Sequence, residues 1–179
     1  MVSVLPSKRY TLRVLVVDDH PVVREGLRAL LTSQDDIEVA GEAASGASAI
    51  RRAGYDSPDV VVMDVRLPDM SGVAACRTIV ERFPDVKVLM LSSHVDEETV
   101  HEAILAGAAG YLVKRIDGER IIEAVRSVAR GASVIDPAAT AKLFAEQGAR
   151  VAAIDLNDGP LEAVVAEIQT AGREARAWQ

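Results

Sequence analysis

Short Val/Leu/Ile runs alternate with longer Ala-rich stretches of helical period over most of this chain, from about residue 12 to about residue 131. The short runs have the length of strands and the long stretches that of helices, so the pattern predicts repeated strand–helix units that close one parallel sheet. Five such pairs fit. The expected strands are residues 12–17, 37–43, 60–63, 86–91 and 110–113.

Helix boundaries are indicated by local chemistry between these strands. Pro21 suits a first helical turn, where its missing N–H costs nothing. Ser45 and Ser71, each followed by glycine, open the next two helices, and Gly107 and Gly131 suit left-handed helix ends. The expected helices are residues 21–31, two that begin at 45–46 and 71–72, 96–106 and 117–130.

Charge and composition exclude several classes of protein. Lys and Arg total 20 against 27 Asp and Glu, which gives a net charge of −7. A negative net charge disfavours binding of nucleic acid by this chain alone. The one cysteine, Cys76, cannot form an internal disulfide and is expected in the core. No apolar run reaches about 18 residues. We expect a cytoplasmic protein without a membrane partner.

Polar side chains follow the ends of four expected strands. Asp18 and Asp19 follow the first strand, Asp64 the third, Ser92 the fourth and Lys114 the fifth. Ligands of open parallel sheets bind beyond the carboxyl ends of the strands. If strands one, three, four and five are neighbours, then three carboxylates, a hydroxyl and an ammonium converge on one pocket.

The chemistry of such a pocket points to phosphoryl transfer. Three carboxylates a few ångströms apart repel one another by roughly 1 kcal/mol per pair even in a watery dielectric, and a divalent cation would relieve this repulsion. Oxygen ligands match Mg²⁺ better than Zn²⁺. A carboxylate within reach of a phosphoryl group can become a nucleophile and form an acyl phosphate, with Lys114 and Ser92 holding the transferred oxygens.

Simpler structural roles stay open for each of these residues taken singly. Asp18 and Asp19 could cap a helix, and Ser92 could cap the next one. Lys114 by itself is usually a solvated lysine, and Tyr111 could be an ordinary half-buried strand aromatic.

Taken together, these motifs resemble the receiver domain of two-component response regulators over about residues 12–136. The resemblance is carried by Asp18-Asp19, by Asp64 within Val61–Gly72, by Ser92 and by Tyr111-Leu112-Val113-Lys114. The stretches 18–27 and 105–114 resemble the NarL/FixJ-like subfamily that normally carries a LuxR-type helix-turn-helix. The resemblance implies a flavodoxin-like (βα)5 doubly wound parallel α/β sheet of strand order 2-1-3-4-5.

The resemblance also implies an acceptor and a metal site. Asp64 would accept a phosphoryl group from a sensor histidine kinase. Asp18, Asp19, Asp64 and the backbone carbonyl of Arg66 would hold Mg²⁺, and Lys114 would pair with the phosphoryl group. No enzymatic activity is expected beyond phosphorylation and dephosphorylation at Asp64.

A conformational switch is implied as well. Ser92 would hydrogen-bond a phosphoryl oxygen while Tyr111 swings inward. This movement would remodel the face formed by the fourth helix, the fifth strand and the fifth helix, which a partner protein or a second copy would then read.

The last 42 residues, 138–179, break this pattern. They predict a helix at 137–147, a strand at 150–155 and a helix at 160–171, that is, an extra helix-strand-helix segment without a helix-turn-helix. Four basic side chains stand against six acids, a net charge of −2, so we expect no direct DNA binding and a missing DNA-binding output.

This tail resembles part of a short-chain dehydrogenase of the Rossmann type. Residues 140–155 resemble its first helix and second strand, with Asp155 where the family binds the ribose of NAD, and residues 161–178 resemble the helix that follows. However, Ile135-Asp136-Pro137 replaces the glycine-rich loop, the chain stops before another strand, and no Tyr-x-x-x-Lys pair exists. Dehydrogenase activity is therefore not expected.

We accordingly expect an N-terminal extension at 1–11, a receiver domain at 12–136 and a Rossmann-like fragment at 137–179. Natural fusion, engineered chimera and sequence artefact all stay open as its origin. The tail strand should pair with an edge in this chain or in a second copy, which makes a homodimer a hypothesis. The alternative functions are a non-switching interaction module and an NAD-binding fragment.

Overall fold

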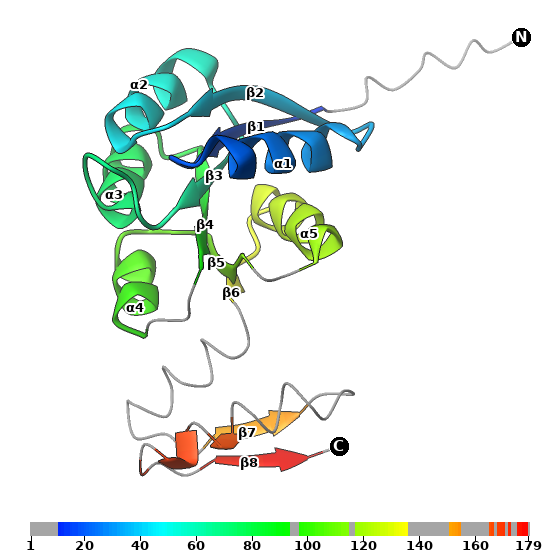
Figure 1. Cartoon of the computed structure of the whole chain (residues 1–179), viewed down its shortest axis with the longest axis vertical. Helices are drawn as coiled ribbons and strands as arrows, with labels where there is room; N and C mark the ends of the chain where they lie inside the picture. The colour runs from blue at the N-terminus through cyan, green and yellow to red at the C-terminus, as the bar shows by residue number, and fades with distance from the viewer. Residues whose placement is uncertain are drawn as a thin grey trace, which may run out of the picture.

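The computed structural model describes residues 11–93, 97–114, 117–135, 151–154, 165–166, 168–170, 172 and 175–178. Strands and helices alternate through most of the chain (Figure 1). In chain order the elements are β1 Leu12–Val17, α1 Pro21–Thr32, β2 Ile37–Ala43, α2 Gly46–Asp56, β3 Val60–Asp64, α3 Gly72–Arg82, β4 Lys87–Ser92, α4 Glu97–Leu105, β5 Gly110–Val113, α5 Gly118–Ala129, β6 Val134–Ile135, β7 Val151–Ile154 and β8 Ala175–Trp178.

One six-stranded parallel sheet forms the centre of the fold. Its strand order is β2-β1-β3-β4-β5-β6, so the expected order 2-1-3-4-5 is confirmed and β6 adds a strand at the β5 edge. Helices α1 and α5 cover one face and α2, α3 and α4 the other (Figure 1). The chain therefore has the doubly wound α/β architecture of the flavodoxin type.

Each face of the sheet has its own core. Along β1 the buried side chains of Leu15 and Val17 face the cluster under α2, α3 and α4, whereas Val14 and Val16 face the cluster under α1 and α5. Both faces are covered, which is why the strands read as continuous aliphatic runs rather than as an alternation. Cys76 is fully buried in the first cluster, as expected.

The residues predicted to cap helix ends have the expected hydrogen bonds and backbone conformation. Ser45 Oγ accepts a hydrogen bond from the Ser48 N–H at 3.3 Å, and Ser71 Oγ accepts one from the Ala74 N–H at 3.2 Å. Gly107 has a φ of +87°, in the left-handed region that favours glycine.

Several predicted boundaries are wrong by one or two residues. β3 extends through Asp64 and β4 runs from residue 87 through Ser92, so both polar residues end their strands instead of following them. The fourth helix ends at Leu105 instead of residue 106, whereas residue 96 lies outside the described residues. β6 was not predicted, because two residues are too few to show a period.

The tail differs from its prediction at its end. β7 pairs in parallel with β8, from Val151 opposite Ala175 to Ile154 opposite Trp178. The expectation that 161–178 is one helix and that no further strand follows is therefore wrong. Within the expected helix 160–171, the described residues 165–166 and 168–170 are helical, with Val165 and Ile168 buried. The predicted helix at 137–147 and Asp155 lie outside the described residues.

None of the helices in the described ranges is long and apolar enough to cross a membrane.

Candidate functional site

The five expected site residues lie at one edge of the sheet. Asp18 and Asp19 directly follow β1, Asp64 ends β3, Ser92 ends β4 and Lys114 directly follows β5. Since β1, β3, β4 and β5 are consecutive neighbours, the carboxyl ends of these strands meet at the same edge. The predicted convergence is observed for the two carboxylates that contact Lys114.

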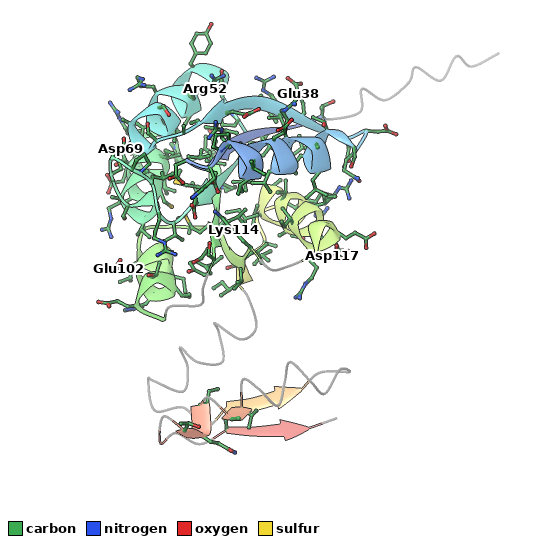
Figure 2. All side chains as sticks on the ribbon, viewed as in Figure 1. Glu38, Arg52, Asp69, Glu102, Lys114 and Asp117 are labelled. Atoms are coloured by element: carbon green, nitrogen blue, oxygen red, sulfur yellow. The ribbon has the colours of Figure 1, made fainter. Side chains whose placement is uncertain are left out.

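Lys114 bridges two buried carboxylates. Its Nζ lies 2.5 Å from Asp18 Oδ2 and 3.0 Å from Asp64 Oδ2, and Figure 2 labels this side chain at the centre of the sheet. Asp18 is 1% exposed and the Lys114 side chain 18%. Charged side chains are rarely buried to this degree unless they are paired, so the three residues depend on one another.

Backbone contacts hold the Asp18 region in place. The His20 N–H donates to Asp18 Oδ1 at 2.8 Å, and the Asp18 N–H donates to the Ala43 carbonyl at 3.1 Å. From α1, the Arg24 guanidinium donates to the Asp18 carbonyl oxygen at 2.7 Å. The turn after β1 is therefore tied to α1 and to β2.

Ligand atoms for a cation gather at this turn. One atom each from Asp18, Asp19, His20 and Asp64 lies within 4.8 Å of the others. Asp19 Oδ1 is buried and makes no hydrogen bond to the described residues, although His20 Nδ1 lies 2.8 Å away. A buried carboxylate oxygen without a hydrogen bond is costly, and a hard divalent cation would satisfy it. The donor set therefore fits Mg²⁺.

Asp64 titrates differently from an exposed aspartate. Burial raises the pKa of its carboxyl group, and the hydrogen bond and charge of Lys114 oppose this rise without cancelling it. The nearby charge of Asp18 raises the pKa further, while a hydrogen bond from the Arg66 backbone lowers it. The ionised form of Asp64 thus depends on positive charge in the pocket.

The loop from β3 to α3, residues 65–71, folds back on Asp64. The Gly72 N–H donates to the Val65 carbonyl at 2.7 Å, and Arg66 and Ser71 form an isolated antiparallel bridge. A Cβ atom on Gly72 would lie 2.0 Å from the Asp64 carbonyl oxygen. Only glycine permits this approach, which keeps the Arg66 backbone beside the Asp64 carboxyl group.

Ser92 and Tyr111 lie on neighbouring strands. Ser92 is buried at the end of β4, and its carbonyl accepts the Lys114 N–H at 2.6 Å. Tyr111 is 1% exposed and packs in the cluster under α2, α3 and α4, with Met90 and Ile135 as its strand neighbours. In this structure the Tyr111 side chain is therefore in an inward position.

Three contacts around the pocket escaped sequence reasoning. His20 joins the group of possible ligands, Arg24 holds the Asp18 carbonyl, and Asp69 bonds to the first turn of α2. The Asp-Asp-His-Pro run directly after a strand could have pointed to His20. The Asp69 contact gives no local signal, because its partners lie 22 and 23 residues away.

A doubly wound parallel sheet with an acidic pocket at its carboxyl edge defines a class of α/β domains, and comparison with known proteins identifies the family. The response regulator receiver domain family matches residues 14–126. The chain belongs to this family and is a two-component response regulator receiver.

Individual response regulators are also similar to this chain in sequence and in structure. The chain is 46% identical over 134 residues to the DNA-binding transcriptional activator DevR/DosR of Mycobacterium tuberculosis, covering 75% of this chain and 62% of that protein. It is 43% identical to the response regulator protein VraR of Staphylococcus aureus, covering 74% and 64%. A LuxR-family response regulator structure from Aurantimonas sp. SI85-9A1 superposes with a TM-score of 0.73 at 33% identity, covering 76% of this chain and 98% of that one.

Two expectations find no support in these comparisons. The comparisons do not support the resemblance of residues 138–179 to a short-chain dehydrogenase. They also do not support the expected absence of DNA binding, since one relative is a DNA-binding transcriptional activator. The chain spans about three fifths of the length of the curated relatives that it matches.

Proposed function

We propose that this chain is a phosphorylation-dependent switch, in which Asp64 accepts a phosphoryl group from a sensor histidine kinase in a Mg²⁺-dependent reaction. The observation that carries the proposal is the Lys114 ammonium, which contacts both Asp18 and Asp64 at the carboxyl edge of the sheet. A cation paired with two buried carboxylates neutralises the charge of an incoming phosphoryl group where a nucleophile is already in place.

The proposed step is a displacement at phosphorus. A carboxylate oxygen of Asp64 forms the new O–P bond while the P–N bond to the kinase histidine breaks, and the imidazole keeps the electron pair of that bond. Asp18, Asp19, Asp64 and the Arg66 carbonyl would hold Mg²⁺, which supplies positive charge for the phosphoryl oxygens. Lys114 contributes a second positive charge, fixed by its two carboxylate contacts.

The proposed response follows from the placement of Ser92 and Tyr111. Ser92 ends β4, the strand that pairs with β3, and β3 ends at the proposed acceptor Asp64. If Ser92 bonds a phosphoryl oxygen, Tyr111 on the next strand holds its inward position, and the face of α4, β5 and α5 takes its phosphorylated form. A partner protein or a second copy of the chain reads that face.

The proposal places the chain in the cytoplasm, where a sensor kinase can reach it, and in transcription regulation like its relatives. The names of those relatives supply the transcriptional assignment. Whether the signal ends in DNA binding is a property of the whole protein, and the net charge of −2 on residues 138–179 supports a protein surface as the direct output of this part.

Phosphorylation with a small donor tests the proposal. Acetyl phosphate and Mg²⁺ should add one phosphoryl group to the intact chain, read by mass spectrometry. The gain should vanish when Mg²⁺ is chelated and in the Asp64→Asn variant. Asp85→Asn is a matched control, because Asp85 lies in an exposed loop between α3 and β4, and should be phosphorylated like the unchanged protein.

The opposite result would have a clear meaning. If the folded chain gained no phosphoryl group, the pocket would not act as an acceptor and a non-switching interaction module would replace the proposal. If Asp64→Asn still gained one, the acceptor would be a different residue.

A further inference from the structure

We propose that Asp69 is a positioning residue for the phosphorylation site, which acts by fastening the β3–α3 loop to the first turn of α2. This inference rests on the proposed function. Asp69 lies in the loop that follows Asp64, and Figure 2 shows it on the side of α2 and α3, well apart from Lys114. It does not touch the reacting atoms.

The contact itself is bidentate. Asp69 Oδ1 accepts the Gly46 N–H at 2.8 Å and Oδ2 accepts the Ala47 N–H at 2.9 Å. These N–H groups belong to the first turn of α2, whose donors have no partner inside the helix. Two charge-assisted bonds at the positive end of a helix dipole form a strong and directional link. The same bonds lower the pKa of the Asp69 carboxyl group.

A second contact fits the loop to the same turn. A Cβ atom on Gly46 would lie 2.4 Å from Met70 Cγ and 2.8 Å from Met70 Sδ, so the Met70 side chain fills the space that a glycine leaves. Adjacent loop residues thus bond to and pack against the start of α2. Both contacts come from residues 69 and 70, in the second half of the loop.

The other end of the loop reaches the site. The Arg66 backbone donates a hydrogen bond to the Asp64 carboxyl group, and its carbonyl is the proposed fourth oxygen for Mg²⁺. Between Arg66 and Ser71 the loop is closed by one isolated bridge. Because this bridge joins the loop only to itself, the hydrogen bonds of Asp69 and the packing of Met70 tie this part of the loop to α2. Fixing this part of the loop limits the positions that the Arg66 carbonyl can take.

Asp69 could instead serve only to cap α2, and the chain offers a matched control for that role. Ser45 is the N-cap of the same helix and accepts the Ser48 N–H through its own side chain, so the hydrogen bonds of its hydroxyl group within the described residues are with Ser48 and not with the loop. Ser45→Ala and Asp69→Ala both remove hydrogen bonds from the first turn of α2. Only Asp69→Ala removes hydrogen bonds between the loop and α2.

The test is Mg²⁺ affinity of the full chain, measured by isothermal titration calorimetry with MgCl₂. Asp69→Ala should bind Mg²⁺ about tenfold more weakly, the size of effect seen for groups that orient metal ligands. Asp69→Asn keeps one acceptor oxygen and should lie between the two. Ser45→Ala should bind like the unchanged protein. Phosphorylation by acetyl phosphate should slow in Asp69→Ala at low Mg²⁺ and recover at high Mg²⁺.

Two results would overturn the inference while leaving the proposed function intact. One is unchanged Mg²⁺ affinity in Asp69→Ala; the other is an equal loss in Asp69→Ala and Ser45→Ala, which would reduce Asp69 to a helix cap. If Asp69→Ala does not fold, equal affinity of Asp69→Asn and the unchanged protein overturns it as well. Failure of the unchanged protein to bind Mg²⁺ or to accept phosphate would instead sink the proposed function, and this inference with it.

Discussion

The buried surroundings of Asp64 disfavour the ionised form of its carboxyl group. Its side chain is buried, and burial outweighs the attraction of Lys114, so the pKa of the carboxyl group is raised. Residues at functional sites often carry such a cost, because the arrangement that permits the chemistry is not the most stable one. The cost can be measured without any phosphoryl donor.

In the metal-free protein, Asp64→Asn should be more stable than the unchanged chain at pH 7, by an amount on the order of 1 kcal/mol. The raised pKa means that the folded protein keeps the Asp64 proton to a higher pH than the unfolded chain. The contribution of Asp64 to the free energy of unfolding is therefore fully present below the pKa of about 4 in the unfolded chain. It is lost as the pH rises through the higher pKa of the folded protein. Asparagine has no proton to lose, so the difference should vanish in acid.

Urea unfolding with a chelator at neutral and acidic pH would measure this difference. A less stable Asp64→Asn variant at pH 7 would show that the contact with Lys114, and not burial, dominates the energetics of Asp64.

At the scale of elements, two glycines with opposite surroundings separate helix propensity from site geometry. Gly26 lies in the middle of α1, exposed, with open space where a Cβ atom would stand. Gly72 begins α3, and a Cβ atom there would meet the Asp64 carbonyl oxygen at 2.0 Å and the Val65 Cα at 3.1 Å. Both neighbours of Gly72 are backbone atoms, which cannot rotate away.

Gly26→Ala should therefore stabilise the protein by about 0.5–1 kcal/mol, since alanine loses less backbone entropy in a helix. Gly72→Ala should destabilise it by about 1–3 kcal/mol and slow phosphorylation, because the loop must move off Asp64. Chemical unfolding and the acetyl phosphate reaction read the two effects. Normal phosphorylation in Gly72→Ala would contradict the close approach at Asp64.

Sequence patterns predicted the elements whose signal is local. The runs that became β1 and β3 are aliphatic throughout, and Ser45 and Ser71 are recognisable caps, so their elements appear where expected. The convergence of Asp18, Asp64 and Lys114 could be predicted for the same reason, since each follows or ends such a run. The contacts of Asp69 with α2 depend on the fold alone, and no spacing reveals them.

The end of the chain shows the limit of the same reasoning. Residues 175–178 alternate alanine with larger side chains, a pattern that fits a helix edge as well as a strand, and the structure resolves the ambiguity through pairing with β7. β6 is a strand only because its residues Val134 and Ile135 lie beside β5.

At the scale of the whole molecule, residues 1–136 and the tail should be separable. The site residues all lie between Asp18 and Lys114, and the six-stranded sheet ends at β6. A chain ending at residue 136 should accept a phosphoryl group at the same rate as the full chain. Loss of this reaction in a folded truncated chain would show that the tail contributes to the site.

Sedimentation of the same two chains tests the homodimer hypothesis. The described part of the tail forms a two-stranded parallel sheet, an arrangement that is seldom stable without further cover. If a second copy provides the cover, the full chain should associate and the truncated chain should not. Identical monomeric sedimentation at high concentration would reject pairing through the tail.

The sixth strand also defines a junction. Ile135 lies opposite Tyr111 and packs against the cluster that holds the tyrosine ring. Any domain fused directly after Ile135 would begin at a point whose position and direction are set by the sheet. No flexible residues would separate the two. In a fusion protein of this kind, the orientation of the added domain would therefore change with each residue added to the linker. A flexible linker would leave that orientation undefined.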